Sequence, residues 1–155
     1  MMSDAYRPSK LFTVEQANAV LPLVRAITAD LVRLSREVME RRERVALLSG
    51  RRGAATQDLY AQELAQIEEE LQKDSEQLDV YVDELRALGV EPKSGPEGLV
   101  DFPCRMDGRI VFLCWKLGEP EVTHWHELDS GYAGRQSLVA GSLAQDGGEP
   151  ADDTL

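Results

Sequence analysis

Apolar residues recur at spacings of three and four along the first third of the chain. The series consists of Ala17, Val20, Val24, Ile27, Leu31, Leu34, Val38, Val45 and Leu48. A spacing that averages 3.5 residues is typical of a helix that packs along one seam against a second helix. Thr13 and Gln16 have the spacing of a capping box, which predicts that this helix begins at Thr13 and runs to residue 48.

The same spacing returns after a turn at residues 49–53. The second series consists of Tyr60, Leu64, Ile67, Leu71, Leu78, Tyr81, Leu85 and Leu88. It predicts a helix that starts near Thr56 and ends at Gly89, since glycine readily adopts the left-handed conformation that closes a helix. Two helices of similar length joined by a short turn predict an antiparallel hairpin over residues 13–89, about 50 Å long at 1.5 Å per residue.

From Gly98 onward the hydrophobic period changes to two. Three runs rich in Val, Ile, Phe and Trp predict strands at Leu99–Met106, Arg109–Lys116 and Glu121–Leu128. Asp107-Gly108 favours a two-residue primed turn between the first two strands. That turn would pair Val100 with Trp115 and place Asp101 and Cys114 on the opposite face. We therefore expect an α+β fold, with a long antiparallel helical hairpin followed by a three-stranded antiparallel meander.

The length of 155 residues fits one domain, which we place at residues 1–138. It would contain the hairpin at 13–89 and the meander with a glycine loop at 98–138, and residues 139–155 would form a disordered acidic tail. Strands of about 20–23 Å would cover about half of the hairpin. Several apolar residues of the first helix lie outside the seam between the two helices and would need another surface to pack against. They are Leu21, Leu23, Val32, Met39 and Leu47. We expect a homodimer through the hairpins, with a monomer whose hairpin projects as the alternative.

Charge narrows the possible partners. The chain has 28 acidic and 17 basic residues and a net charge of −11, which argues against binding to nucleic acid or to an anionic membrane. Residues 33–52 hold seven arginines and three glutamates, and residues 56–88 hold ten acids and two bases, so the two helices should form ion pairs. No apolar run approaches the length of a membrane span, and no export signal is visible at the N-terminus. A soluble, cytoplasmic protein is therefore expected.

Both histidines lie in the short run Thr123–Glu127. Alternate residues of a strand share a face, so His124 and His126 could converge on one divalent metal such as zinc, helped by a carboxylate or a thiolate. If residues 118–120 form a three-residue loop, His124 faces Cys114, and both histidines share a face with Asp101. A loop of two or four residues instead turns both histidines toward Trp115 and places Glu127 beside Asp101. The sequence leaves both registers open.

Other residues near this run are also candidates for ligand binding. Arg135 lies between glycines and a polar segment and could hold a carboxylate or phosphate with two hydrogen bonds, or could pair with one of the many acids. Glu119 could act as a ligand or general base at a loop tip, or could be solvated. Trp115 and Trp125 could line a pocket or belong to the core. Cys114 could be a nucleophile activated by a histidine, or could simply be packed in the interior.

Several short motifs resemble the bacterial Domain of Unknown Function 2203 family. They are G-L-V-D-F-P at residues 98–103, L-C-W at 113–115, G-E at 118–119, W-H-E at 125–127 and G-Y-A-G-R at 131–135. The start of the first helix, L-F-T-V-E-Q-A-N-A-V-L-P-L-V, belongs to the same resemblance. Because the place of His124 is often aromatic in that family, the resemblance shifts the expected site toward His126, Glu127, Asp101, Glu119 and Arg135. It implies no known activity.

The leading functional hypothesis is therefore a site for a divalent metal or a small anionic ligand on the meander. Its expected metal ligands are His126, Glu127, His124 and Asp101, and its expected ligand-binding residues are Arg135, Trp115, Trp125 and Glu119. The alternative is a non-catalytic protein whose helical hairpin mediates dimerisation or partner binding. A metal-dependent hydrolase is the third hypothesis.

Overall fold

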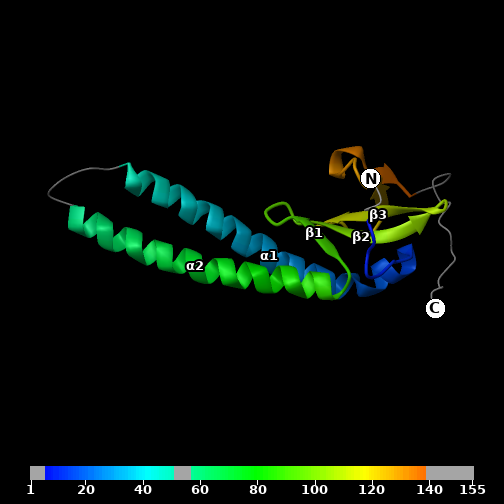
Figure 1. Ribbon diagram of the computed structural model, residues 1–155, viewed down its shortest axis with the longest axis horizontal. Coiled ribbons are helices and arrows are strands. Elements are labelled where there is room, and N and C mark those ends of the chain that lie inside the picture. The colour runs from blue at the N-terminus through cyan, green and yellow to red at the C-terminus, as the bar shows by residue number, and fades with distance from the viewer. Residues whose placement is uncertain (1–5, 51–56, 139–155) are drawn as a thin grey trace.

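The computed structural model describes residues 6–50 and 57–138. Two long helices, α1 (Val14–Ser49) and α2 (Gln57–Ala87), form a hairpin that projects from a small sheet (Figure 1). The remaining elements are β1 (Glu91–Ser94), β2 (Leu99–Met106), β3 (Arg109–Lys116), β4 (His124–His126), the short 3-10 helix η3 (Tyr132–Gly134) and β5 (Gln136–Ser137). The predicted α+β class is confirmed. The predicted tail and most of the predicted turn at residues 49–53 lie outside the described residues.

Local hydrogen bonds fix the helix ends as the sequence predicts. The Thr13 hydroxyl accepts from the Gln16 amide, and the Gln16 side chain accepts from the Thr13 amide, both at 3.0 Å. At the end of α2, the amides of Gly89 and Val90 donate to the carbonyls of Arg86 and Leu85. Gly89 has a φ of +91°, so this is the glycine-terminated end that the sequence indicates.

Within the described residues, the sheet has five antiparallel strands in the order β1-β2-β3-β4-β5, which extends the predicted three. The two additional strands, β1 and β5, are four and two residues long and lie at the sheet edges. Their sequences, EPKS and QS, have no alternating apolar pattern, so local signals could not reveal them. The predicted third strand, Glu121–Leu128, is shorter than expected, since regular pairing covers only β4.

The register of the central strands decides which side chains meet. Asp107 and Gly108 both have positive φ, at 53° and 77°, so the predicted primed turn is confirmed. It pairs Val100 with Trp115 and Asp101 with Cys114. Between β3 and β4, Cys114 pairs with His124 and Phe112 with His126. This is the register that the three-residue loop predicted, so both histidines belong to the face that carries Asp101 and Cys114.

The opposite face of the sheet packs on the hairpin and forms the core. Its fully buried residues include Val100, Phe102, Val111, Leu113 and Trp115, and they join Val24, Leu31 and Leu85 of the helices. The segment before α1 closes one edge of this core. Phe12 packs edge-on against Phe102 at a centroid distance of 5.2 Å, and its amide donates to the Pro103 carbonyl at 2.7 Å.

The sheet covers only one end of the hairpin. The buried residues of α1 end at Val38, and Ile67 is the one buried residue among the described side chains of residues 39–50 and 59–70. Arg41 pairs there with Asp74, and Arg44 pairs with Glu63, as the opposite charges of the helices predicted. Neither described helix has an apolar stretch long enough to cross a bilayer.

Candidate metal centre

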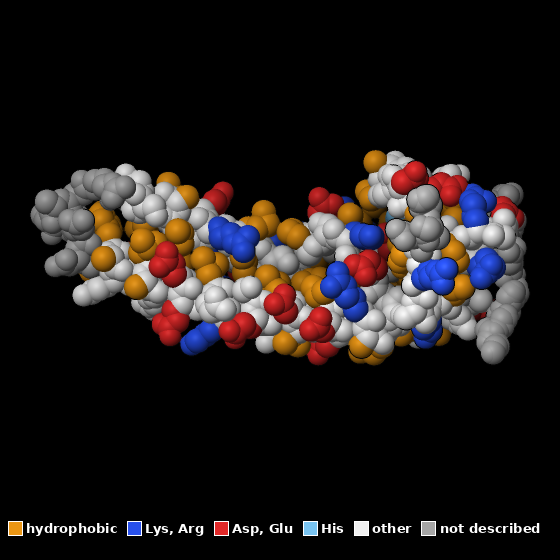
Figure 2. Space-filling view, viewed as in Figure 1, with side chains coloured by type: hydrophobic (Ala, Val, Ile, Leu, Met, Phe, Trp, Pro, Cys, Tyr) orange, Lys and Arg blue, Asp and Glu red, His pale blue; other side chains and the backbone are white. Residues whose placement is uncertain are grey.

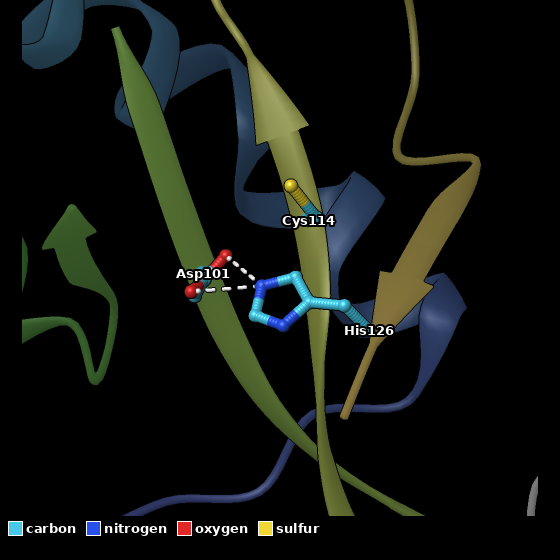
Figure 3. A group of neighbouring side chains, drawn as sticks. All are labelled: Asp101, Cys114 and His126. Atoms are coloured by element: carbon cyan, nitrogen blue, oxygen red, sulfur yellow. Dashed lines mark hydrogen bonds and ion pairs between the residues drawn. The ribbon is translucent and has the colours of Figure 1, made fainter. Parts of the chain in front are cut away.

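Three neighbouring strands each place one polar side chain on the sheet face away from the hairpin. Asp101 comes from β2, Cys114 from β3 and His126 from β4 (Figure 3). One oxygen, one sulfur and one nitrogen of these side chains lie within 4.8 Å of one another. Each residue is at most 2% exposed. The cross-strand register therefore builds a buried group of three different metal-ligand types.

The ring of His126 is held by hydrogen bonds on both of its nitrogens. Nδ1 lies 2.7 Å from the backbone carbonyl oxygen of Glu127. A carbonyl can only accept, so we assign the proton to Nδ1. Nε2 lies 3.1 Å from both carboxylate oxygens of Asp101. In the neutral ring, the Nε2 lone pair would face these oxygens directly, and the contact is favourable only with a proton or a metal cation between them.

Burial controls the ionisation of the other two members. It raises the pKa of Asp101, and the neighbouring His126 and Lys93 oppose that rise only in part. Burial also raises the pKa of Cys114 to about 11, and the negative charge of Asp101 adds to the rise. Without a cation the Cys114 thiol therefore stays protonated at neutral pH. A divalent ion would reverse this preference, since metals bind the thiolate.

A cavity of about 280 Å³ adjoins the three side chains. Besides Asp101, Cys114 and His126, its lining consists of Lys93, Leu99 and the loop at residues 128–132. This loop connects β4 to η3 and lies over the sheet on the side away from the hairpin (Figure 1). The group is thus buried by the loop, yet it faces a space that can hold a small molecule.

Two of the predicted metal ligands lie outside this group. Glu127 forms an ion pair with Arg109, with 3.1 Å between Oε1 and Nε, and its side chain is 40% exposed. The Arg109 hydrogen bond lowers the pKa of Glu127. His124 is half-buried, and its Nδ1 lies 3.0 Å from the Thr123 hydroxyl. The ligand set that the geometry supports therefore replaces Glu127 and His124 with Cys114.

Arg135 and Glu119 bind each other. Arg135 Nη1 lies 3.2 Å from Glu119 Oε1, and a second bond joins Nη2 to Oε2. Burial by itself would raise the pKa of Glu119, but hydrogen bonds from Arg135 and from the Lys116 amide outweigh it and lower the pKa. The bond to Glu119 raises the pKa of Arg135. Since Glu119 occupies the guanidinium, Arg135 has the second of the two roles left open from sequence, an ion pair with an acid. It lies beside Cys114, with Nη1 4.0 Å from Sγ.

The two tryptophans belong to the face that packs on the hairpin. Trp115 is fully buried, and its indole N–H donates to the Glu119 carbonyl at 2.9 Å. Trp125 is 7% exposed and joins the same hydrophobic core. Neither residue lines the cavity described above. Of the two interpretations open from sequence, the structure supports the core role.

Sequence reasoning missed Lys93 altogether and left Cys114 as a conditional member. Lys93 belongs to β1, whose residues carry no strand signal, so its position beside Asp101 depends on the tertiary fold. Cys114 could have been found from the Asp107-Gly108 turn together with the three-residue loop, because these two registers bring Asp101, Cys114 and the histidine face together.

Fold and site together define an α+β protein with a projecting helical hairpin and a buried Asp-Cys-His group on its sheet. The family model described as an uncharacterized conserved protein, DUF2203, matches residues 10–138. The chain belongs to this family, as the sequence motifs had indicated. The matched segment contains both long helices and every strand among the described residues. No curated protein and no solved structure matches the chain.

Proposed function

We propose that this protein binds a divalent transition-metal ion, with zinc as the best match, through Asp101, Cys114 and His126. The observation that carries the proposal is the convergence of a carboxylate oxygen, a thiol sulfur and an imidazole nitrogen within 4.8 Å. Zinc accepts all three ligand types, whereas calcium and magnesium prefer oxygen alone. A mixed, buried set with one thiol therefore favours a borderline-soft ion.

The hydrogen bonds of His126 support the same assignment. Histidines that bind metals usually donate the proton of their other ring nitrogen to a carbonyl or carboxylate, which orients the ring and fixes its tautomer. The Glu127 carbonyl has this role at 2.7 Å from Nδ1. The Nε2 lone pair is then directed at Asp101. Without metal, this contact is favourable only with a proton between the two side chains, and an ion there would replace that proton with two metal-ligand bonds.

Three protein ligands leave one position of a tetrahedral ion for another molecule. Structural zinc sites are closed by four protein ligands, whereas three ligands and an open position are typical of sites that bind water or substrate. All three proposed ligands line the cavity, so the fourth position would face it. Ligation also requires Cys114 in its reduced form, which agrees with a cytoplasmic location.

The experiment is a metal analysis of protein purified without a histidine tag. After incubation with zinc and removal of excess ion, we expect about one zinc per chain in the wild type. Asp101→Asn, Cys114→Ser and His126→Ala should each lose most of it, while the matched variant His124→Ala should retain it. Circular dichroism would confirm that each variant is folded. A wild type without zinc, or an equal loss in His124→Ala, would contradict the proposal.

A second candidate function is self-association through the hairpin. Met39, Leu47 and Leu59, here called the distal apolar surface, are 54%, 67% and 64% exposed and lie on the part of the hairpin that the sheet does not cover. We propose a second copy as the partner, because the charges of the two helices complement each other. Figure 2 shows acidic side chains along α2, and residues 33–52 are rich in arginine. In an antiparallel dimer, α1 of each copy would meet the acidic α2 of the other.

A further inference from the structure

We propose that the open side of the metal centre binds a small carboxylate monoanion, with Lys93 as its charge partner. This inference rests on the proposed metal site and names the class of its external ligand. It starts from the cavity of about 280 Å³, which is just below the roughly 300–1,000 Å³ typical of small-molecule sites. The ligand must therefore be small.

Lys93 is the one cationic residue among those that line the described cavity. Its ammonium lies 5.0 Å from the centroid of the Phe112 ring, and the His126 ring lies 5.6 Å from the same ring. Lys93 also acts electrostatically on Asp101. The contact with Phe112 and the effect on Asp101 place the positive charge of Lys93 near the proposed metal ligands, although Lys93 belongs to the edge strand β1.

The charges that line the cavity favour a ligand with no more than one negative charge. A divalent ion bound by the Asp101 carboxylate and the Cys114 thiolate forms a neutral centre. The remaining charges of the lining are then those of Lys93 and Asp129, which have opposite signs. A monoanion can bind the ion on the side of Lys93, whose charge it balances. A phosphate dianion would bring a second negative charge that no other cation of the described lining balances, and Asp129 would repel it.

Two other cationic residues near the loop, Arg135 and Lys116, do not line the cavity. Arg135 is bound to Glu119 by two hydrogen bonds. Lys116 lies over the Tyr132 ring, at 5.5 Å from its centroid. Carboxylate oxygens are good ligands for divalent ions, so a carboxylate can bind the open position while its charge is neutralised by Lys93.

Cobalt(II) can replace zinc as a spectroscopic probe, and the test uses the full chain loaded with it. Acetate is the ligand probe, and inorganic phosphate is the comparison. We expect acetate to change the visible cobalt spectrum in a saturable way. Lys93→Gln should weaken acetate binding by about tenfold without weakening cobalt binding, as expected for loss of one charge partner of the anion. The matched variant Lys116→Gln should change acetate affinity less than twofold.

The outcomes separate the two proposals. If cobalt does not bind to the wild type, the metal site itself is refuted, and the inference falls with it. If cobalt binds but acetate leaves the spectrum unchanged, only the inference is overturned. Tighter binding of phosphate than of acetate, or equal weakening in Lys93→Gln and Lys116→Gln, would also overturn it, because the ligand class or the role of Lys93 would be different.

Discussion

The Nε2 atom of His126 lies 3.1 Å from both carboxylate oxygens of Asp101, and both side chains are at most 3% exposed. Removal of one member of such a pair strongly lowers the free energy of unfolding, because it leaves the other member buried without its partner. The two side chains should therefore be strongly coupled in the absence of metal, and the pair positions two of the three proposed ligands.

A double-mutant cycle measures this coupling. In the presence of a chelator, Asp101→Asn and His126→Asn should each lower the free energy of unfolding by about 3–5 kcal/mol, because each leaves the other side chain buried without its original partner. The double variant should cost about 1–3 kcal/mol less than the sum of the two. Urea unfolding gives these values. Asp101→Asn combined with His124→Asn serves as the control and should be additive; an additive Asp101–His126 cycle would contradict the pairing.

Metal binding should release a proton from Cys114. Its pKa of about 11 keeps the thiol protonated at neutral pH, while zinc binds the thiolate. Isothermal titration calorimetry in buffers of different ionisation enthalpy counts the protons released. At protein and zinc concentrations high enough to saturate the weakened site of Cys114→Ser, we expect this variant to release about one proton fewer per zinc than the wild type. Cys104→Ala should leave the count unchanged, since Cys104 belongs to the core on the other face. An unchanged count in Cys114→Ser would exclude the thiolate as a ligand.

The Glu119–Arg135 pair should stabilise the loop in a pH-dependent way. The pKa of Glu119 is lowered in the folded protein, so the stabilisation is present above the unfolded value of about 4.3 and is lost as pH falls through the folded value. Glu119→Gln should therefore lower the free energy of unfolding by about 1 kcal/mol at pH 7. The difference from the wild type should shrink as the pH falls below 4.

Urea unfolding at several pH values tests this prediction. Glu121→Gln is the matched control, because Glu121 is an exposed neighbour in the same connection between β3 and β4. Glu121→Gln should change the free energy of unfolding only slightly, and by nearly the same amount at each pH. If the difference in free energy of unfolding between the wild type and Glu119→Gln grew as the pH fell, the role assigned to the pair would be refuted.

The distal apolar surface should control self-association. Sedimentation equilibrium of the wild type should reveal a dimer that dissociates on dilution. Leu47→Asp and Leu59→Asp should weaken the dimer by at least about tenfold, since each places an unpaired charge in an apolar contact. Val80→Asp is the control, because Val80 is 46% exposed but lies outside the distal apolar surface. A wild type that is monomeric at every concentration would refute the proposal.

Local patterns in the sequence determined the main elements of the fold. The 3.5-residue spacing predicted both helices, the capping box located the start of α1, and Gly89 located the end of α2. The Asp107-Gly108 turn fixed the pairing of β2 with β3 residue by residue. These features depend on interactions between residues close in sequence, or on a turn with few alternatives, and so they can be predicted without knowledge of the rest of the chain.

The tertiary structure decided how the candidate site is assembled. The register of β4 depends on a connection that contains Pro120 and admits more than one loop, so the sequence could not choose between His126 and Glu127 as the residue that joins Asp101 and Cys114. The edge strand that carries Lys93 forms because β2 offers it a partner, and it has no pattern of its own. The loop over the cavity likewise buries the site through contacts between distant segments. Each of these contacts depends on pairing between strands, which local sequence alone does not specify.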